Sequence, residues 1–415
     1  MAISAEEANW LVDPAQYQAR GYPWEVWARL RREEPVYRIE QGFGAPVWAV
    51  TRYQDILAIE TNPDLFRNGP RLTVGFTYAH YEFPPPMNFR MIVNMDPPGH
   101  GAHRALANPF FMPRSIAWVR ALAEEIVTEV LDRAMARNGD VIDLQEDVAN
   151  LVPTAVISAY LGAPREAWGR IIAATNLIIN ANDPTVAKDE GSAGLIMRAT
   201  GEVYQIHAAT FADRRAHPRD DFMTALVRAE IDGKPLSDME LFSWALILTT
   251  AGHETTQSTF GLGVELLMQH PEILARLRAD PALLPRAIEE MLRHISPAIH
   301  FCRTPDRDVE VGGRQIAAGE HMVMFYPSAN RDESVFADPD RFDIDRHPNR
   351  HLAFGCGPHV CIGQHLARLE LRVMFEQFLA RVERIEPAGA PVRVHANSTG
   401  GYRHFPVRMS VRPKG

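Results

Sequence analysis

The feature that most constrains the fold is a long stretch without helix breakers that begins at Ser237. Ser237 and Glu240 form a capping box, in which the serine hydroxyl accepts from the backbone N–H three residues on and the glutamate reaches back to the cap. The next proline is Pro271, so about 33 residues can form one helix, roughly 50 Å long. Its first part, LFSWALIL, is apolar on all sides and is predicted to be buried. The chain must therefore fold around a helix that crosses a whole domain.

The rest of the chain predicts a mainly α-helical body with small antiparallel β-sheets. Apolar residues recur at helical spacing in four further segments, 117–136, 151–161, 194–217 and 222–230. Strand-like segments are shorter and lie at 47–51, just before Gly312, at 321–326 and near the C-terminus. Since no repeat, low-complexity tract or Gly/Ser linker divides the sequence, residues 1–415 are predicted to form a single domain.

Charge and composition exclude several classes of protein. The 43 Lys and Arg against 52 Asp and Glu give a net charge of -9, so no basic field attracts nucleic acid. The N-terminus lacks the basic and apolar regions of a signal peptide, and no run approaches the roughly 20 apolar residues of a membrane span. Three cysteines are too few and too unevenly placed for a disulfide framework, which suits a reducing compartment. We therefore expect a soluble, cytoplasmic protein that has no membrane span and does not bind nucleic acid.

The middle of the long helix opposes helix propensity. It reads TTAGHETT over 249–256, where β-branched residues flank a glycine, so local strain or a kink is expected. Glu254 and Thr255 place a carboxylate and a hydroxyl in an otherwise apolar helix, where polar groups are costly to bury. Two interpretations of this segment are equally good. Either Thr255 bonds back to a carbonyl while Glu254 reaches the surface, or the pair serves a cofactor nearby.

A glycine-rich loop surrounds Cys361 immediately before another helical pattern. A cysteine at the start of a helix faces its positive end and unpaired N–H groups, which are expected to lower the thiol pKa and favour the thiolate. The glycines of the loop allow a flat ligand to approach the backbone closely. Because Cys356, His359 and His365 are close in sequence, a zinc site is the alternative, although it would need four converging ligands.

The cysteine loop matches a known signature. Phe354-Gly355-x-Gly-x-His359-x-Cys361-x-Gly363 resembles, without a departure, the haem-binding signature of the cytochrome P450 family. Three further motifs follow the order of that family: Ala251-Gly252-x-Glu254-Thr255-Thr256, similar to its oxygen-activation motif, Glu290-x-x-Arg293, and Pro339-Asp340-Arg341-Phe342. The resemblance implies the cytochrome P450 fold, with the long central helix over the haem. It also implies a buried Glu290–Arg293–Arg341 network that supports the cysteine side of the fold.

The same resemblance implies roles for individual residues. Cys361 would be the thiolate ligand of the iron in haem b (iron protoporphyrin IX), which favours O–O cleavage. Glu254 would relay protons from solvent, and Thr255 would hold the bound oxygen and water. Buried anions need cationic partners, and the family's positions for partners of the two haem propionates align with His100, Arg104, Arg303 and His359. The remaining implied cofactor contacts are Ala251, Phe354, Gly355 and Gly363.

The implied activity is hydroxylation of a small hydrophobic substrate with O2. No flavin or iron–sulfur module is fused to the chain, so two electrons are expected from a separate ferredoxin and an NAD(P)H-dependent ferredoxin reductase. Arg114, Arg346, Arg350, Arg368 and Arg372 are candidates for a ferredoxin docking surface, and solvated arginines without a partner are an equally good interpretation. The rival functions are a peroxide-driven peroxygenase, whose members usually lack an acid–alcohol pair such as Glu254–Thr255, and a non-catalytic haem sensor.

The substrate is less well defined by the sequence. The family's variable substrate-facing loop corresponds to about 68–94, which is aromatic and carries few charges. Further candidate contacts are Leu248, Ala251, Ile299, His300, Phe301 and Thr399. Among them His300 is an unusual polar residue for such a position. Terpenoid, steroid, fatty acid and aromatic substrates all remain compatible with this pattern.

Overall fold

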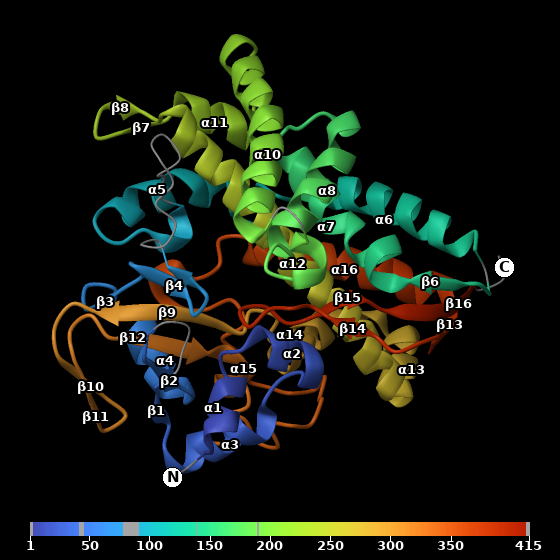
Figure 1. Ribbon diagram of the computed structural model, residues 1–415. Coiled ribbons are helices and arrows are strands. Elements are labelled where there is room, and N and C mark those ends of the chain that lie inside the picture. The colour runs from blue at the N-terminus through green and yellow to red at the C-terminus, as the bar shows by residue number, and fades with distance from the viewer. Residues whose placement is uncertain (1–2, 41–44, 78–90, 138, 189–190, 412–415) are drawn as a thin grey trace.

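The computed structural model describes residues 3–40, 45–77, 91–137, 139–188 and 191–411, and helices dominate it (Figure 1). The longest is α12 (Asp238–Gln269), with 32 residues. Its first turn has both bonds of the predicted capping box, since Ser237 Oγ accepts from Glu240 N at 3.3 Å and Glu240 Oε2 accepts from Ser237 N at 2.8 Å. It ends before Pro271, where α13 (Pro271–Ala279) begins. The prediction of one long helix is confirmed.

Helix α12 lies at the centre of the helical body. It packs against α7 (Leu151–Tyr160), α8 (Trp168–Ile179), α10 (Gly191–Ala216), α14 (Leu284–Ile295) and α16 (Gln364–Arg381). Outside these lie α6 (Val119–Met135), against α7 and α16, and α11 (Phe222–Arg228), against α10. The four predicted helical segments correspond to α6, α7, α10 and α11. The last is shorter than predicted because 230–231 form strand β7 (Glu230–Ile231).

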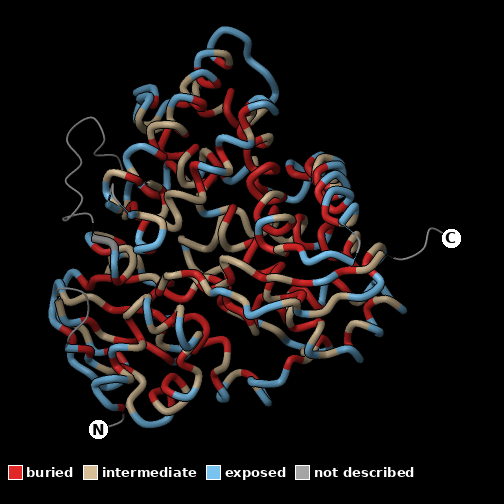
Figure 2. Tube along the Cα trace, turned by 45° about the vertical axis from the view of Figure 1, so that its right-hand side comes forward, coloured by how far each residue is buried: buried red, intermediate tan, exposed pale blue. Residues whose placement is uncertain are grey.

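The central packing is close enough to require a glycine. A Cβ at Gly263 of α12 would lie 2.7 Å from the ring of Phe375 and 3.1 Å from the sulfur of Met291, so helices α16 and α14 leave no room for a side chain. Beside it, the Phe260 and Phe375 rings are 4.9 Å apart. Buried segments run through this part of the body in Figure 2.

The threonine-rich centre of α12 stays helical. The hydroxyls of Thr249, Thr250, Thr255 and Thr259 each donate to the carbonyl four residues earlier, at 2.7–3.1 Å. These bonds satisfy the side chains without interrupting the backbone ladder. Residues 249–256 are therefore helical throughout, and the local strain or kink expected there stays a prediction.

The β-strands form small sheets beside the helical body (Figure 1). The largest has the order β1 (Val36–Ile39), β2 (Val47–Val50), β12 (His321–Phe325), β9 (His300–Pro305) and β3 (Phe66–Arg67). A second sheet has the order β13 (Val382–Pro387), β16 (Pro406–Val411) and β6 (Val141–Asp143). The pairs are antiparallel as predicted, except that β12 runs parallel to β2. The period of a strand does not reveal its direction, so this pair could not be foreseen.

The remaining elements are short. The two-stranded sheets are β4–β5 (Arg71–Thr73 and Phe76–Thr77), β7–β8 (the latter Lys234–Pro235), β10–β11 (Val309–Val311 and Arg314–Ile316) and β14–β15 (Val392–Arg393 and Tyr402–His404). The short helices are α1 (Ala5–Trp10), α2 (Pro14–Arg20), α3 (Trp24–Glu33), α4 (Tyr53–Glu60), α5 (Gly99–Ala107), α9 (Pro184–Ala187) and α15 (Tyr326–Ala329). Trp27 and Leu30 of α3 pack on the largest sheet. Within the described part of the chain, no helix is both long and apolar enough to span a membrane.

Candidate functional site

The cysteine loop folds back on itself before α16. The backbone N–H of Cys361 donates to the carbonyl of Phe354 at 2.8 Å, which closes the loop. Gly355 and Gly357 both have φ of +65°, and a Cβ at Gly357 would collide with the carbonyl oxygen of Glu60. Helix α16 begins at Gln364, with Gly363 as its N-cap. Cys361 therefore lies just before the first turn of the helix.

The thiol of Cys361 has opposing electrostatic influences. Burial raises its pKa, while the N–H of Gly363 and the positive charges of Arg104 and Arg368 lower it. The net direction in the protein alone is upward. The expected lowering was wrong because the sequence indicates the helix terminus but not the burial. A bound metal ion would favour the thiolate at this position.

The second cysteine of the loop belongs to a different cluster. Glu60, at the end of α4, accepts from Cys356 N at 2.9 Å and from Cys356 Sγ at 3.3 Å. The same carboxylate accepts from Arg303 Nη2 at 3.2 Å and Tyr326 Oη at 2.6 Å. Among the residues that the structure describes, no three His, Cys, Asp or Glu side chains converge as a zinc site would require. Glu60 was not identified from the sequence, because it stands alone on a short amphipathic helix.

The four predicted cationic residues lie near one another beside the cysteine loop. The rings of His100 and His359 stack with centroids 3.8 Å apart, and Arg104 Nη2 donates to Val360 O at 2.6 Å. Arg303, in β9, is 4% exposed. Asn68, another residue that the sequence did not single out, places Nδ2 at 2.8 Å from His359 Nε2.

These groups repel one another. Burial lowers the pKa of His359 to about 2, and the charge of Arg303 contributes. Burial and the charge of Arg104 lower the pKa of His100 to about 4. His100 Nε2 is buried without a hydrogen-bond partner, and no carboxylate among the described residues bonds to His100, Arg104 or His359. The cluster is thus suited to bind anionic groups that the chain itself does not supply.

The centre of α12 presents a polar pair and an exposed alanine. Ala251 is exposed although Thr249 and His253 of the same helix are fully buried, and Thr255 Oγ1 donates to Ala251 O at 3.1 Å. Glu254 Oε1 accepts from Thr399 Oγ1 at 2.6 Å. Burial raises the pKa of Glu254 to about 7, and the Thr399 bond opposes the shift. The interpretation in which Thr255 bonds back to a carbonyl and Glu254 reaches the surface is therefore half right. Thr255 does bond to the Ala251 carbonyl, but Glu254 bonds to Thr399 inside the protein.

His253, between these residues, has a structural role. Its Nδ1 meets Thr154 Oγ1 of α7, and its Nε2 lies 2.9 Å from Asn176 Oδ1 of α8. Burial lowers its pKa to about 3, so the ring is neutral. These two contacts fix α12 to α7 and α8 at the level of the polar pair.

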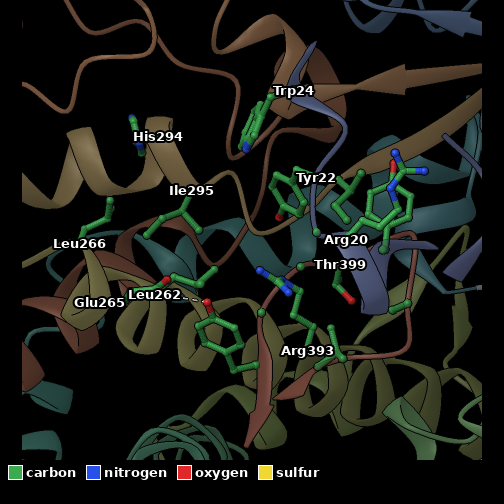
Figure 3. Close-up of a pocket in the computed structure, with 18 of the residues that line it drawn as sticks. Arg20, Tyr22, Trp24, Leu262, Glu265, Leu266, His294, Ile295, Arg393 and Thr399 are labelled. Carbon is green, nitrogen blue, oxygen red and sulfur yellow. Dashed lines mark hydrogen bonds between the residues drawn. The ribbon is translucent and has the colours of Figure 1, made fainter. Parts of the chain in front are cut away.

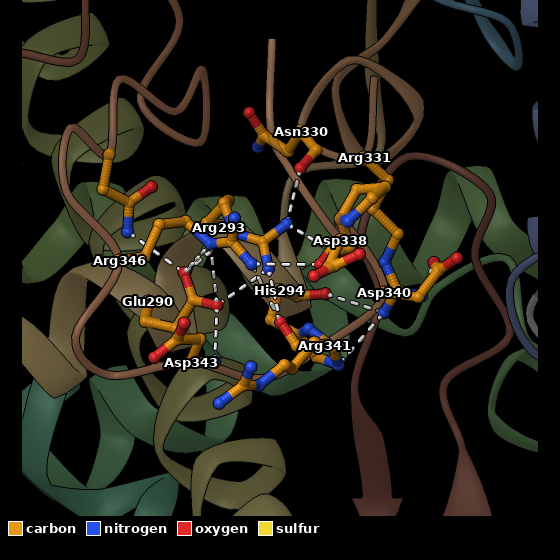
Figure 4. Close-up of polar contacts among 12 residues, drawn as sticks. Glu290, Arg293, His294, Asn330, Arg331, Asp338, Asp340, Arg341, Asp343 and Arg346 are labelled. Carbon is orange, nitrogen blue, oxygen red and sulfur yellow. Dashed lines mark hydrogen bonds and ion pairs between the residues drawn. The ribbon is translucent and has the colours of Figure 1, made fainter. Parts of the chain in front are cut away.

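The buried ion-pair network differs from the predicted one (Figure 4). Glu290 and Arg293 of α14 are both 0% exposed and form two bonds of 2.8 Å. The third charged partner is Arg346, whose Nε lies 3.2 Å from Glu290 Oε2. Arg341 contributes only its backbone carbonyl, which accepts from Arg293 Nη2 at 3.1 Å, while its side chain is exposed. The predicted third arginine was wrong because the irregular loop 337–346 turns the Arg346 side chain inward.

Comparison with known proteins decides the family. The model of the family described as Cytochrome P450 matches residues 168–392. Linalool 8-monooxygenase of Pseudomonas putida is 34% identical, over 93% of this chain and 95% of its own length. The chain belongs to the cytochrome P450 family. Steroid C26-monooxygenase of Mycolicibacterium smegmatis is 35% identical to this chain over 94% of each sequence. Among solved structures, the crystal structure of CYP108D1 from Novosphingobium aromaticivorans matches with a TM-score of 0.88 at 31% identity, over 99% of each chain.

The cytochrome P450 fold and the monooxygenase class that the sequence motifs implied are thereby confirmed. The family implies a haem cofactor, and the residues around Cys361 fit one. The glycines give a flat group access to the thiol, Ala251 is exposed on α12, and His100, Arg104 and His359 have no carboxylate partner among the described residues, so haem propionates could fill that role. Thr399 was considered from the sequence only as a substrate contact, and its bond to Glu254 has no local sequence signal.

Proposed function

We propose that this cytochrome P450 hydroxylates a small hydrophobic substrate with O2. It would receive two electrons from a separate ferredoxin and an NAD(P)H-dependent ferredoxin reductase. The observation that carries the proposal is the grouping of His100, Arg104 and His359 beside the Cys361 loop, because these residues have no carboxylate partner among the described residues and could pair with an anionic cofactor. Glu254, which is half-buried on α12, supports oxygen chemistry rather than simple haem storage, since a carrier has no use for a proton donor.

Haem b would be held by groups from several segments. Cys361 would ligate the iron, and His100, Arg104, Arg303 and His359 would bind the propionates. Contacts with the ring would come from Ala251, Phe354, Gly355 and Gly363. When bound, a thiolate-ligated haem supplies oxygen activation with O–O cleavage. The position of Phe354 is supported by Arg368, whose guanidinium lies 4.4 Å from the ring centroid.

The polar pair on α12 would supply protons. With a pKa raised to about 7, Glu254 is partly protonated at neutral pH and so can both donate a proton and be reprotonated. Thr255 is adjacent on the helix, and its hydroxyl, which donates to the Ala251 carbonyl, could instead donate to a water molecule or accept from one. In these roles the two residues would be catalytic. Their function would also explain why polar groups, whose burial costs free energy, stand in an otherwise apolar helix.

The substrate class is supported by an apolar environment and by the relatives. The relatives compared above are named for linalool and steroid oxidation. Leu248, Ile299 and His300 are buried, and His300 Nε2 accepts from Val74 N at 3.0 Å. Most of the predicted substrate loop, 78–90, lies outside the described residues. We propose a terpenoid- or steroid-like hydrophobe as the first class to test.

The ferredoxin contact would be narrower than the five predicted arginines. Arg346 is buried in the Glu290 network, Arg368 bonds Glu289 at 2.6 and 2.9 Å, and Arg372 bonds Glu376 at 2.7 Å. Arg114 and Arg350 are exposed. We expect charge reversal at these two positions to slow reduction and to weaken its dependence on salt, because exposed charges steer association.

A substrate screen tests the proposed function. Hydrophobic compounds are first screened for a change in the haem spin state, and those that bind are incubated with ferredoxin, reductase and reduced nicotinamide before product analysis. We expect hydroxylated product that depends on all three components and on O2. Equal turnover with hydrogen peroxide alone would favour the peroxygenase, and binding without oxidation of any ligand would favour the sensor.

A further inference from the structure

A pocket of about 350 Å³ lies beside the C-terminal half of α12 (Figure 3). We call it the Thr399 pocket. Its walls come from α2 and the segment after it, from α12 and α14, and from the turn that joins β14 to β15. The residues that line it include Arg20, Tyr22, Glu265, Arg393, Ala396 and Thr399.

The inner end of the Thr399 pocket reaches the carboxylate on α12. Thr399 lines the pocket, and its hydroxyl donates to Glu254 Oε1 at 2.6 Å. Tyr22 lines the same end, and besides burial the charge of Glu254 raises the pKa of Tyr22. The Tyr22 hydroxyl is already committed, since it donates to Ser296 O at 3.1 Å. Thr399 is therefore the group that connects the pocket with Glu254.

The turn that carries Thr399 is fixed in place. Gly400 N donates to Pro297 O at 2.8 Å, and Ile299 N donates to Ser398 O at 2.8 Å. A Cβ at Gly400 would collide with the Tyr22 hydroxyl, and one at Gly401 with Ser258 Oγ. Gly401 thus lets the turn lie directly on α12, and Gly400 lets it lie directly on Tyr22. Backbone contacts therefore fix the position of the turn and, with it, the position of Thr399 beside Glu254.

The outer end of the pocket is polar and open. Arg20 is exposed on the surface, and Arg393 and Glu265 also line the pocket, with Arg393 beside Thr399 and Glu265 farther away beside Leu262 (Figure 3). Glu265 Oε1 accepts from Tyr402 Oη at 2.9 Å, and burial raises the pKa of Glu265. A water molecule needs about 30 Å³ and two or more polar partners. The pocket is large and polar enough to hold a chain of water molecules that ends at Thr399.

We propose that the Thr399 pocket is the inlet through which protons reach Glu254, with Thr399 as the relay. In this step a hydronium ion in the pocket gives a proton to Thr399 Oγ1 while Thr399 gives its own proton to the Glu254 carboxylate. Water, a neutral hydroxyl and a neutral carboxylic acid result, so charge and atoms balance. Thr399 is a positioning residue, since it acts through Glu254. The inference rests on the proposed role of Glu254 in the monooxygenase reaction.

An infrared titration of the haem-loaded ferric protein tests the contact without turnover. The carboxyl band of protonated Glu254 is identified by its loss in Glu254→Gln. We expect a midpoint near pH 7 in the parent. The midpoint should rise by about one pH unit or more in Thr399→Val, because a donor to the carboxylate is lost, and Thr399→Ser should restore it. An unchanged midpoint in Thr399→Val would overturn the proposed link.

Turnover tests the relay. We expect Thr399→Val to lower product per reduced nicotinamide by about tenfold and to raise the solvent isotope effect, with rescue by Thr399→Ser. Ala396→Phe, which fills the pocket, should also lower the yield while leaving the infrared midpoint unchanged. Thr128→Val removes an exposed hydroxyl on α6 and is the control.

The two proposals can fail separately. If Thr399→Val and Ala396→Phe keep the parent yield while Glu254→Gln loses it, the inlet is refuted and the monooxygenase stands. If the parent forms no product with any ligand that binds, the proposed function fails. The infrared titration then still decides whether Thr399 is coupled to Glu254.

Discussion

The buried network around Glu290 gives a stability prediction that separates two arginines five positions apart. Arg346→Met keeps the aliphatic length but removes one of the two cations at a fully buried carboxylate. It also removes donors to Ala337 O at 2.6 Å and to Arg341 O at 3.1 Å. Charged hydrogen bonds contribute about 1.5–3 kcal/mol each when one partner is lost. We expect a loss of about 3 kcal/mol in the free energy of unfolding.

Two matched variants bracket this value. Arg293→Met breaks the central pair and strands Glu290, which should cost about 3–5 kcal/mol. Arg341→Met changes an exposed side chain whose backbone carbonyl remains in the network, so it should cost less than about 0.5 kcal/mol. The expected order of destabilisation is therefore Arg293, then Arg346, then Arg341.

Urea unfolding of the haem-loaded protein measures this order. Tryptophan fluorescence reports the fold and Soret absorbance reports haem retention in the same sample. We expect both midpoints to fall together in Arg346→Met and to stay at the parent value in Arg341→Met. A variant of Arg341 that is as unstable as the variant of Arg346 would refute the network seen in Figure 4.

Three further predictions concern α12 and the cysteine loop. Thr255→Ala should keep haem and substrate binding but divert reducing equivalents to hydrogen peroxide. Thr250→Ala, which loses a similar hydrogen bond to the carbonyl four residues earlier, should not divert them. An unchanged yield of product in Thr255→Ala would contradict the role proposed for Thr255. The pKa of Glu254 is about 7 in the folded protein, above the usual 4.5, so between these two pH values the folded state binds more protons than the unfolded state. The free energy of unfolding should therefore fall as the pH rises from about 4.5 to 7. In urea titrations, Glu254→Gln should remove this dependence on pH. Gly357 has φ +65° and contacts Glu60 O, so Gly357→Ala should lower the free energy of unfolding by more than about 2 kcal/mol and release haem. Gly313 has φ +77° but open space around it, so Gly313→Ala should lower that free energy by only about 1–2 kcal/mol. Equal losses in the two variants would contradict the loop packing.

Local signals in the sequence were sufficient for the long helix and the cysteine loop. The capping box at Ser237 and the proline at 271 fix the ends of α12 through contacts within one turn. The glycines around Cys361 are needed for backbone conformations that few other residues adopt. The family motifs then placed His100, Arg104 and His359 together, as the structure shows.

Contacts between distant segments were not predictable in the same way. Glu60 and Arg303 are separated by 243 positions, and Glu254 and Thr399 by 145, with no pattern that links them. The choice between Arg341 and Arg346 depends on the path of an irregular loop. The pKa of Cys361 depends on burial by segments far away in sequence, which outweighs the local helix terminus.

The spectrum of the ferrous carbonyl complex tests the central claim most directly. If Cys361 is the axial thiolate, the parent protein should show the red-shifted Soret band of a haem-thiolate protein, and Cys361→Ser should lose it. Cys356→Ser is the matched control, because Cys356 bonds Glu60 and should leave the band in place. A red-shifted band that survives in Cys361→Ser, or that disappears only in Cys356→Ser, would contradict the account.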